Sequence, residues 1–211
     1  MADKVKGQIK IGDKYYDGTV GEFSTQVSPG TYHLADNPEI YEIQRTNNFV
    51  FYTTGLSDII KLTGNAQAEM NADNILELTV TKASVPHFTQ SPIQVKRGNN
   101  TMKFAGVPEF SSGSLAVVDY IGSGVKEVLM AWQSKSYDVR TEKVGLAKDY
   151  KIPAFLVEYT PDYTVVRTWK LEGCWISGLS EGEYNWESND KQLINVTIEY
   201  DKAYIDTSSI E

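Results

Sequence analysis

The acidic residues near the C-terminal end are the first candidates for chemistry in this 211-residue chain. Glu181, Glu183, Glu187 and Asp190 lie close together in sequence, so a calcium loop or a pair of catalytic carboxylates has to be considered. Their spacing lacks the alternating ligands and the closing glutamate of a calcium loop. Spacing alone also assigns no general acid and general base to carboxylates of one hairpin. We interpret the cluster as a solvated hairpin tip.

The other reactive residue types are few and isolated. A zinc site needs several His or Cys ligands at short spacing, whereas the only histidines are His33 and His87. No neighbouring residue offers a base or a lowered thiol pKa to Cys174, so we expect a small buried side chain there. The stretch 122–124 lacks the Lys-Ser/Thr ending of a phosphate loop. We therefore predict that the protein is not an enzyme and has no catalytic, metal or cofactor site.

Composition limits the classes of partner. The net charge of −8, from 28 acidic and 20 basic residues, argues against a protein that grips a nucleic-acid backbone. An acidic conduit could still let nucleic acid pass without adhesion, although moderate acidity also simply keeps a protein soluble. The single cysteine excludes an internal disulfide and fits a reducing compartment. No apolar run approaches a membrane span, so we expect a cytosolic product with no membrane partner.

The elements that would position these residues are mostly strands, with one short helix among them. Residues 114–119, 155–159, 163–175 and 193–201 are strand-like. Between the first two of these strands, apolar residues fall at helical spacing from near Gly124 to about Ser136, with Ser123 available as a cap. The residues of this packing helix are Val125, Val128, Leu129 and Trp132. This pattern predicts an all-β domain, an antiparallel β-sandwich or barrel with one flanking α-helix.

The remaining segments are less regular. Residues 1–45 suggest an N-terminal arm with a hairpin, or an extended segment that lies on another surface. Gly98-Asn99-Asn100 predicts a hairpin turn between the strands 93–96 and 102–104. Residues 53–74 have the character of a long irregular loop, which in a compact domain is commonly functional. The stretch 75–82 alternates, with Leu76, Leu78 and Val80 on one face, and we expect a strand there. Without a linker to divide it, the chain is predicted to form one domain over 1–211.

The aromatic residues leave two interpretations open. The chain contains 13 Tyr and 4 Trp, and Trp169, Trp175 and Trp186 are close in sequence. They could form a sugar-binding platform, which would make the protein a carbohydrate- or receptor-binding β-sandwich with Trp175 and Trp186 exposed. Alternatively, large side chains with one polar atom fill β-sandwich cores and subunit interfaces. We favour the second interpretation.

The order of these elements resembles a known family. A strand ending at Asp119 precedes a helix that ends near Trp132-Gln133, and Trp-x-Leu-x-Gly-x-Trp follows at 169–175. The chain then closes with a strand ending Tyr200-Asp201. Over residues 45–205 this is similar to the tail tube proteins of contractile-tailed bacteriophages, which share a fold with the tube proteins of type VI secretion systems and contractile bacteriocins.

The resemblance implies a structural virion protein that does no catalysis. Subunits of this family form hexameric rings that stack into the tail tube, assembled in the host cytoplasm, with strands joined into one inner β-barrel. DNA and the tape measure protein pass through the lumen, and the sheath, baseplate and tail terminator proteins are the other partners. The resemblance leaves open whether this chain is the main tube subunit or a tube-initiating or tube-terminating relative.

Two sets of residues receive candidate roles on this basis. Polar strand faces could line a water-filled lumen or point outward, and the carboxylates that could repel DNA there are Glu77, Glu172, Glu199 and Asp201. The 53–74 loop and the N-terminal arm are candidates for contacts between rings. The ring-stacking candidates in the loop are Ile59, Ile60, Asn65 and Asn71.

Overall fold

A computed structural model describes residues 6–11, 14–19, 43–62 and 64–206. The chain divides into two compact units, Met1–Gln44 and Arg45–Glu211. The first contains an antiparallel hairpin of β1 (Lys6–Ile11) and β2 (Lys14–Thr19), so the hairpin expected in the N-terminal arm is confirmed. Its predicted turn at 12–13 and His33 lie outside the described residues. The prediction of one domain over 1–211 stays a prediction.

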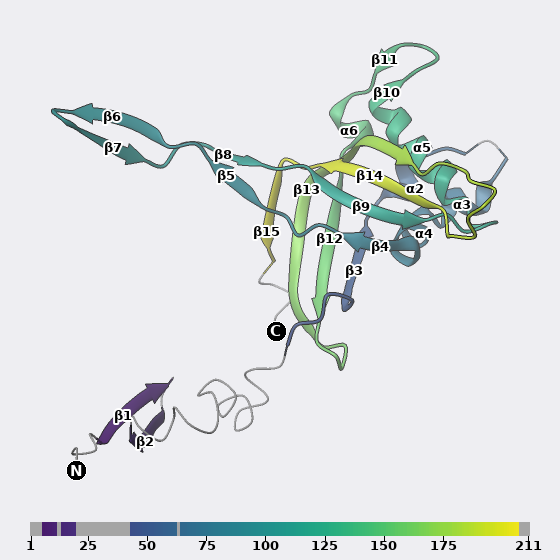
Figure 1. Cartoon of the computed structure of the whole chain (residues 1–211). Coiled ribbons are helices and arrows are strands. Elements are labelled where there is room, and N and C mark those ends of the chain that lie inside the picture. Colours follow the sequence, from purple (N-terminus) through teal and green to yellow (C-terminus); the bar gives the residue numbers. More distant parts are fainter. Residues whose placement is uncertain (1–5, 12–13, 20–42, 63, 207–211) are drawn as a thin grey trace. The chain divides into compact units, whose positions relative to one another are not determined.

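The second unit is built on a bent antiparallel sheet (Figure 1). Its strand order is β3-β12-β13-β14-β9-β4, and β15 also pairs with β13. The bounds are β3 Phe49–Thr53, β4 Val80–Ala83, β9 Gly113–Val118, β12 Ile152–Tyr159, β13 Val165–Glu181, β14 Leu193–Glu199 and β15 Lys202–Ile205. The first half of β13 pairs with β12 and β15, and its second half pairs with β14, so one long strand joins both halves of the sheet. The mainly β fold predicted from the sequence is confirmed.

The helix expected near 124–136 is α5 (Val125–Ser136). Val125, Val128, Leu129 and Trp132 are all buried, because their spacing places them on the one helical face that packs against β13. Gly124 begins the helix at a positive φ of 69°, and Ser123 Oγ accepts a hydrogen bond from Val125 N (3.3 Å). After α5 come the short strands β10 (Tyr137–Asp138) and β11 (Lys143–Val144) and the one-turn helix α6 (Ala147–Tyr150).

The prediction of an irregular loop at 53–74 is wrong. The segment contains α2 (Leu56–Ile59), α3 (Ala66–Met70) and the start of α4 (Ala72–Thr79). α2 and α3 each begin at backbone N–H groups that donate hydrogen bonds to side-chain oxygen atoms. Asn65 Oδ1 accepts from Ala68 N (3.1 Å), and the Asp73 carboxylate accepts from the N–H groups of Leu56 and Ser57 (both 3.1 Å).

The expected strand at 75–82 is also wrong for most of its length. α4 continues to Thr79, and only Val80–Ala83 forms strand β4. The exposed fractions of two leucines distinguish a helix from a strand here. Leu76 is 0% exposed and Leu78 is 80% exposed, whereas both would lie on the same face of a strand. Ala72, Leu76 and Thr79 are buried together, which is the spacing of a helix face.

A long hairpin extends from the β4–β9 edge of the sheet (Figure 1). Its inner part pairs β5 (Phe88–Gln90) with β8 (Pro108–Phe110), and its outer part pairs β6 (Ile93–Arg97) with β7 (Asn100–Phe104). Arg97 pairs with Asn100 across the predicted turn, where Gly98 has a positive φ of 63°. The predicted hairpin is therefore confirmed. No helix in the described part of the chain is long and apolar enough to cross a membrane.

Candidate functional site

The outer hairpin has one apolar face and one polar face. In the register of β6 and β7, Ile93 pairs with Phe104 and Val95 with Met102, so these four side chains share a face. The opposite face carries Gln94, Lys96, Thr101 and Lys103. The apolar face is uncovered: its members are 45–56% exposed, and every residue of both strands is exposed. A lone two-stranded hairpin is at best marginally stable in water, so this face needs a covering surface.

Three aromatic side chains anchor the inner end of the hairpin to the main sheet and its helices, which we call the body. Phe88 and Phe110 face each other across β5 and β8 (ring centroids 5.6 Å), and Phe110 packs edge-on against Tyr200 (6.0 Å). Ser112 Oγ, just beyond β8, donates a hydrogen bond to Glu199 Oε1 (2.7 Å). The body therefore fixes the hairpin where it starts and leaves its outer half free.

The structure brings together three of the four predicted lumen carboxylates. Glu172, Glu199 and Asp201 lie where β13, β14 and β15 meet, since Trp175 pairs with Glu199 and Asp201 N donates to the Glu172 carbonyl oxygen. Glu77, which we expected on a strand, instead lies exposed on α4. The strand prediction placed it wrongly because it misread the period of 75–82.

Two of these carboxylates have lysine partners, which sequence reasoning missed. Asp201 forms an ion pair with Lys151 (2.7 Å), and Glu172 lies 3.5 Å from Lys170 Nζ. The Tyr204 hydroxyl also donates to Glu172 (2.8 Å), and this hydrogen bond, with Lys170 nearby, lowers the pKa of the Glu172 carboxyl. The surface where β13, β14 and β15 meet therefore carries both positive and negative charges and is not purely negative.

The glycine in the Trp-x-Leu-x-Gly-x-Trp motif has a physical explanation here. Gly173 has a positive φ of 69°, and a Cβ at that position would overlap the carboxylate of Asp201. The β13 strand is irregular at this point, because its register with β12 shifts between Ile152 and Ala154. Only glycine permits both the backbone conformation and the close approach of Asp201.

The ring-stacking candidates are distributed over the short helices. Ile60 is buried in the core at 1% exposure, so in the folded subunit it is not available to touch a neighbouring ring. Ile59 is partly buried against the core, Asn65 caps α3, and Asn71 lies between α3 and α4. For Ile59, Asn65 and Asn71 the role in ring contacts stays a prediction.

The candidates for reactive or sugar-binding roles are placed as follows. Cys174 is fully buried, and burial raises the pKa of its thiol to about 12, so it is a core side chain. Trp175 is partly buried with its ring edge-on to Tyr150 (5.5 Å), whereas Trp186 is fully exposed. The two tryptophans therefore do not form one exposed platform. Among the described residues, no group of three or more His, Cys, Asp or Glu is placed to hold a metal ion.

The comparisons with known proteins support the same fold class. No protein-family model and no curated protein sequence matches the chain. Among solved structures, it is similar to a chain of the PVC sheath–tube complex, an extracellular contractile injection system in the extended state (TM-score 0.57, 12% identity). That match covers 86% of this chain and 99% of the other.

Two further structures match over most of their length. The PVC sheath/tube terminator aligns with a TM-score of 0.56 and 15% identity, over 79% of this chain and 98% of that one. The tube-terminating cap of the anti-feeding prophage aligns with a TM-score of 0.55 and 15% identity, over 78% and 91% of the two chains. The chain therefore has the fold of tube components of contractile injection systems, as the resemblance predicted.

Proposed function

We propose that this protein is a structural subunit that polymerises, as stacked hexameric rings, into the tube of a contractile injection machine. The fold similarity supports this class of function. The observation that carries the proposal is the hairpin face of Ile93, Val95, Met102 and Phe104, which no other described part of the chain covers. A second copy of the chain would bury this face and remove its cost in water.

The free edges of the sheet support the same proposal. Within the described residues, β3, β4 and β15 each pair along one edge only. Unpaired edges that remain exposed promote aggregation, and joining them between subunits into a closed barrel removes them. The inner β-barrel of a tube would use these edges.

The finer identity belongs to the proposal as well. We propose the tail tube of a contractile-tailed bacteriophage, with a sheath around it, baseplate and terminator proteins at its ends, and DNA passing through the lumen. The face that carries Glu172 and Asp201 is the candidate lumen wall. Because both carboxylates have lysine neighbours, this wall would be hydrated and only weakly charged, which would limit adhesion of DNA. The proposed role involves no catalysis.

Negative-stain electron microscopy of concentrated purified protein tests the proposal. Rings or tubes are the expected result, and monodisperse particles at every concentration would contradict it. Val95→Ser with Met102→Ser should abolish the assemblies and leave the circular dichroism spectrum unchanged. The matched control is Gln94→Ser with Thr101→Ser, on the polar face of the same hairpin, which should still assemble.

A further inference from the structure

The strand pair β9–β14 has the hairpin at one end and a loop with three carboxylates at the other. Gly113 pairs with Ile198 at the end where the hairpin is rooted, and Val118 pairs with Leu193 at the other end. The second end holds the loop between β13 and β14, which we call the acidic loop (residues 182–192). In Figure 1 the hairpin and this loop lie at opposite ends of the sheet.

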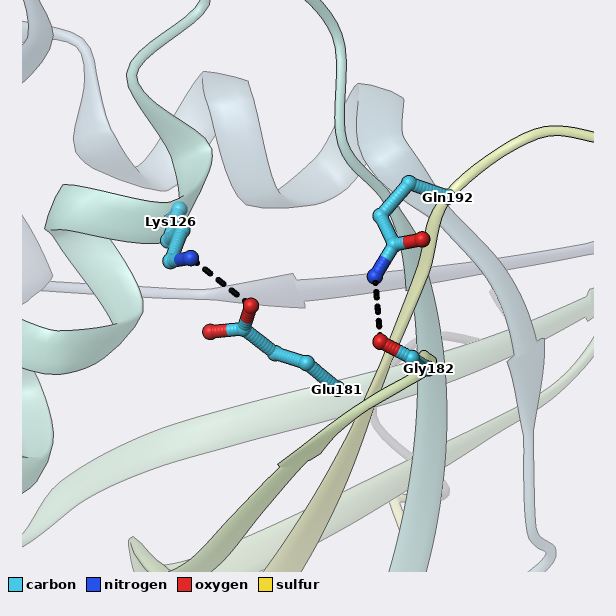
Figure 2. A network of polar contacts seen from close by, with 4 residues as sticks. All are labelled: Lys126, Glu181, Gly182 and Gln192. Carbon is cyan, nitrogen blue, oxygen red and sulfur yellow. Dashed lines mark hydrogen bonds and ion pairs between the residues drawn. The ribbon is translucent and has the colours of Figure 1, made fainter. Parts of the chain in front are cut away.

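The base of the acidic loop is fixed to the body. Gln192 Nε2 donates to the Gly182 carbonyl oxygen (3.1 Å), and Lys126 on α5 pairs with Glu181 (2.7 Å), as Figure 2 shows. Asp119 N donates to the Gln192 carbonyl oxygen (3.1 Å), which joins the loop to the turn after β9. The loop is thus presented on a rigid frame.

The loop surrounds an open cavity whose wall includes two carboxylates, one tyrosine and one cation, Lys191, so its charged groups are mainly negative. The cavity has a volume of about 540 Å³, and Glu183, Tyr184 and Asp190 contribute to its wall. Glu183, Glu187 and Asp190 form no ion pair with any residue that the structure describes. Tyr184 and Trp186 on the loop are strongly exposed.

The hairpin has the complementary composition. Residues 84–112 contain Lys96, Arg97 and Lys103 against Glu109 alone, a net charge of +2 in a chain whose total is −8. These three cations also form no ion pair within the described part of the chain. Lys96 and Arg97 stand directly before the turn at the far tip, Arg97 in register with the apolar face and Lys96 with the polar face.

From this complementarity we infer that the hairpin tip of one copy docks on the acidic loop of a second copy. Lys96 and Arg97 meet Glu183 and Glu187, and the apolar hairpin face covers the aromatic side chains of the loop. The hairpin cannot reach its own loop, since the strand pair β9–β14 separates them. The contact is therefore head-to-tail, a type that propagates along an assembly instead of closing a symmetric dimer. This inference rests on the proposed function and names the receiving surface.

A charge swap tests the pairing. Lys96→Glu with Arg97→Glu, or Glu183→Lys with Glu187→Lys, should each raise the critical concentration for assembly at least about tenfold, since like charges would then face each other. The combined variant, which has the net charge of the original protein, should assemble again. An equimolar mixture of the two double variants should also assemble better than either alone. Lys143→Glu with Lys148→Glu, at two exposed sites outside both surfaces, is the control for net charge and should assemble normally.

The outcomes separate this inference from the proposed function. If the unmodified protein assembles but the loop variant is unaffected, or if the combined variant is no better than the hairpin variant, the acidic loop is not the receiving surface. If the unmodified protein never assembles, the proposed function falls and the inference falls with it. Circular dichroism of each variant shows whether the subunit is still folded.

Cross-linking gives a second measurement that does not depend on charge. Asn99→Cys at the hairpin turn and Ser188→Cys in the cavity wall, prepared as separate proteins, should form a heterodimer with a short thiol cross-linker when mixed. Cys174 stays silent because it is buried. A yield no higher than that of Asn99→Cys mixed with Lys148→Cys would overturn the inference even if a charge variant failed to fold.

Discussion

The strand β14 and the β6–β7 hairpin both alternate apolar and polar residues, but the apolar side chains are buried in the first and exposed in the second. In β14, Ile194, Val196 and Ile198 alternate with polar residues, and all three are buried in the hydrophobic core. In the β6–β7 hairpin, Ile93, Val95, Met102 and Phe104 alternate just as regularly, yet each is about half exposed. Alternation therefore indicates that one face of a strand is to be covered, but not whether the cover comes from the same chain or from another copy.

The largest loss of stability is expected when a buried side chain of the body is removed. Trp132→Ala deletes a side chain that is 1% exposed and loses the hydrogen bond from its Nε1 to the Tyr150 carbonyl oxygen (2.9 Å). We expect a loss of about 3–5 kcal/mol in the free energy of unfolding, measured by urea denaturation. Trp186→Ala on the exposed loop is the control and should change it by less than about 0.5 kcal/mol.

The segment 53–74, which forms short helices, should contribute to the stability of the folded subunit. The Asp73 carboxylate accepts hydrogen bonds from Thr53 Oγ1 (2.7 Å), from Ser57 Oγ (2.9 Å) and from two N–H groups that begin α2. Asp73→Ala should cost about 1–3 kcal/mol of stability because these donors lose their acceptor. Asp58→Ala, at an exposed site on α2, is the matched control. Equal stability of the two variants would show that the segment is not held as described.

Thiol reactivity compares the exposed hairpin with the buried core of the main sheet in one protein. Val95→Cys places a thiol on the exposed hairpin face, whereas Cys174 is buried with a thiol pKa of about 12. At pH 8 in dilute protein, the hairpin thiol should react more than about a hundredfold faster. The fold stability should stay within about 0.5 kcal/mol. Assembly should then protect the hairpin thiol, and unchanged labelling in assembled protein would contradict burial of this face by a second copy.

The smallest effect is expected at the exposed β13–β15 junction. Tyr204→Phe removes the hydroxyl donor to Glu172, so the pKa of Glu172 should rise toward its usual value. A lowered folded-state pKa contributes stability above the unfolded-state pKa, and this contribution is lost as the pH falls through the folded-state value. The variant should therefore lose slightly less stability on acidification. Carboxyl-carbon NMR titration measures the pKa, and an unchanged value would mean that the hydroxyl does not donate to Glu172 in solution.

Much of the fold follows from local patterns. The helix face of Val125, Val128, Leu129 and Trp132 and the strand β14 were predictable because their periods of 3.6 and 2 are unambiguous. The hairpin turn at Gly98 was predictable from residues that accept a positive φ. The exposure of its apolar face was not predicted, although the alternation of apolar and polar residues in the hairpin was visible in the sequence.

The segment 72–79 shows where local patterns fail. Leu76, Leu78 and Val80 fit a strand, but Ala72, Leu76 and Thr79 fit a helix equally well, and so short a segment does not distinguish the two periods. Packing decided in favour of the helix, since Leu76 fits fully into the core and Leu78 remains at the surface.

The sequence by itself determined the class of the fold, the core faces of α5 and β14 and the hairpin turn at Gly98. Only the tertiary structure decided which charges meet, as when Lys151 pairs with Asp201 across 50 residues of chain. It also decided which apolar face stays uncovered. The physical reason is that local periodicity reports which side of an element avoids water, whereas pairing and burial depend on contacts between residues distant in sequence, for which a single chain carries no local signal.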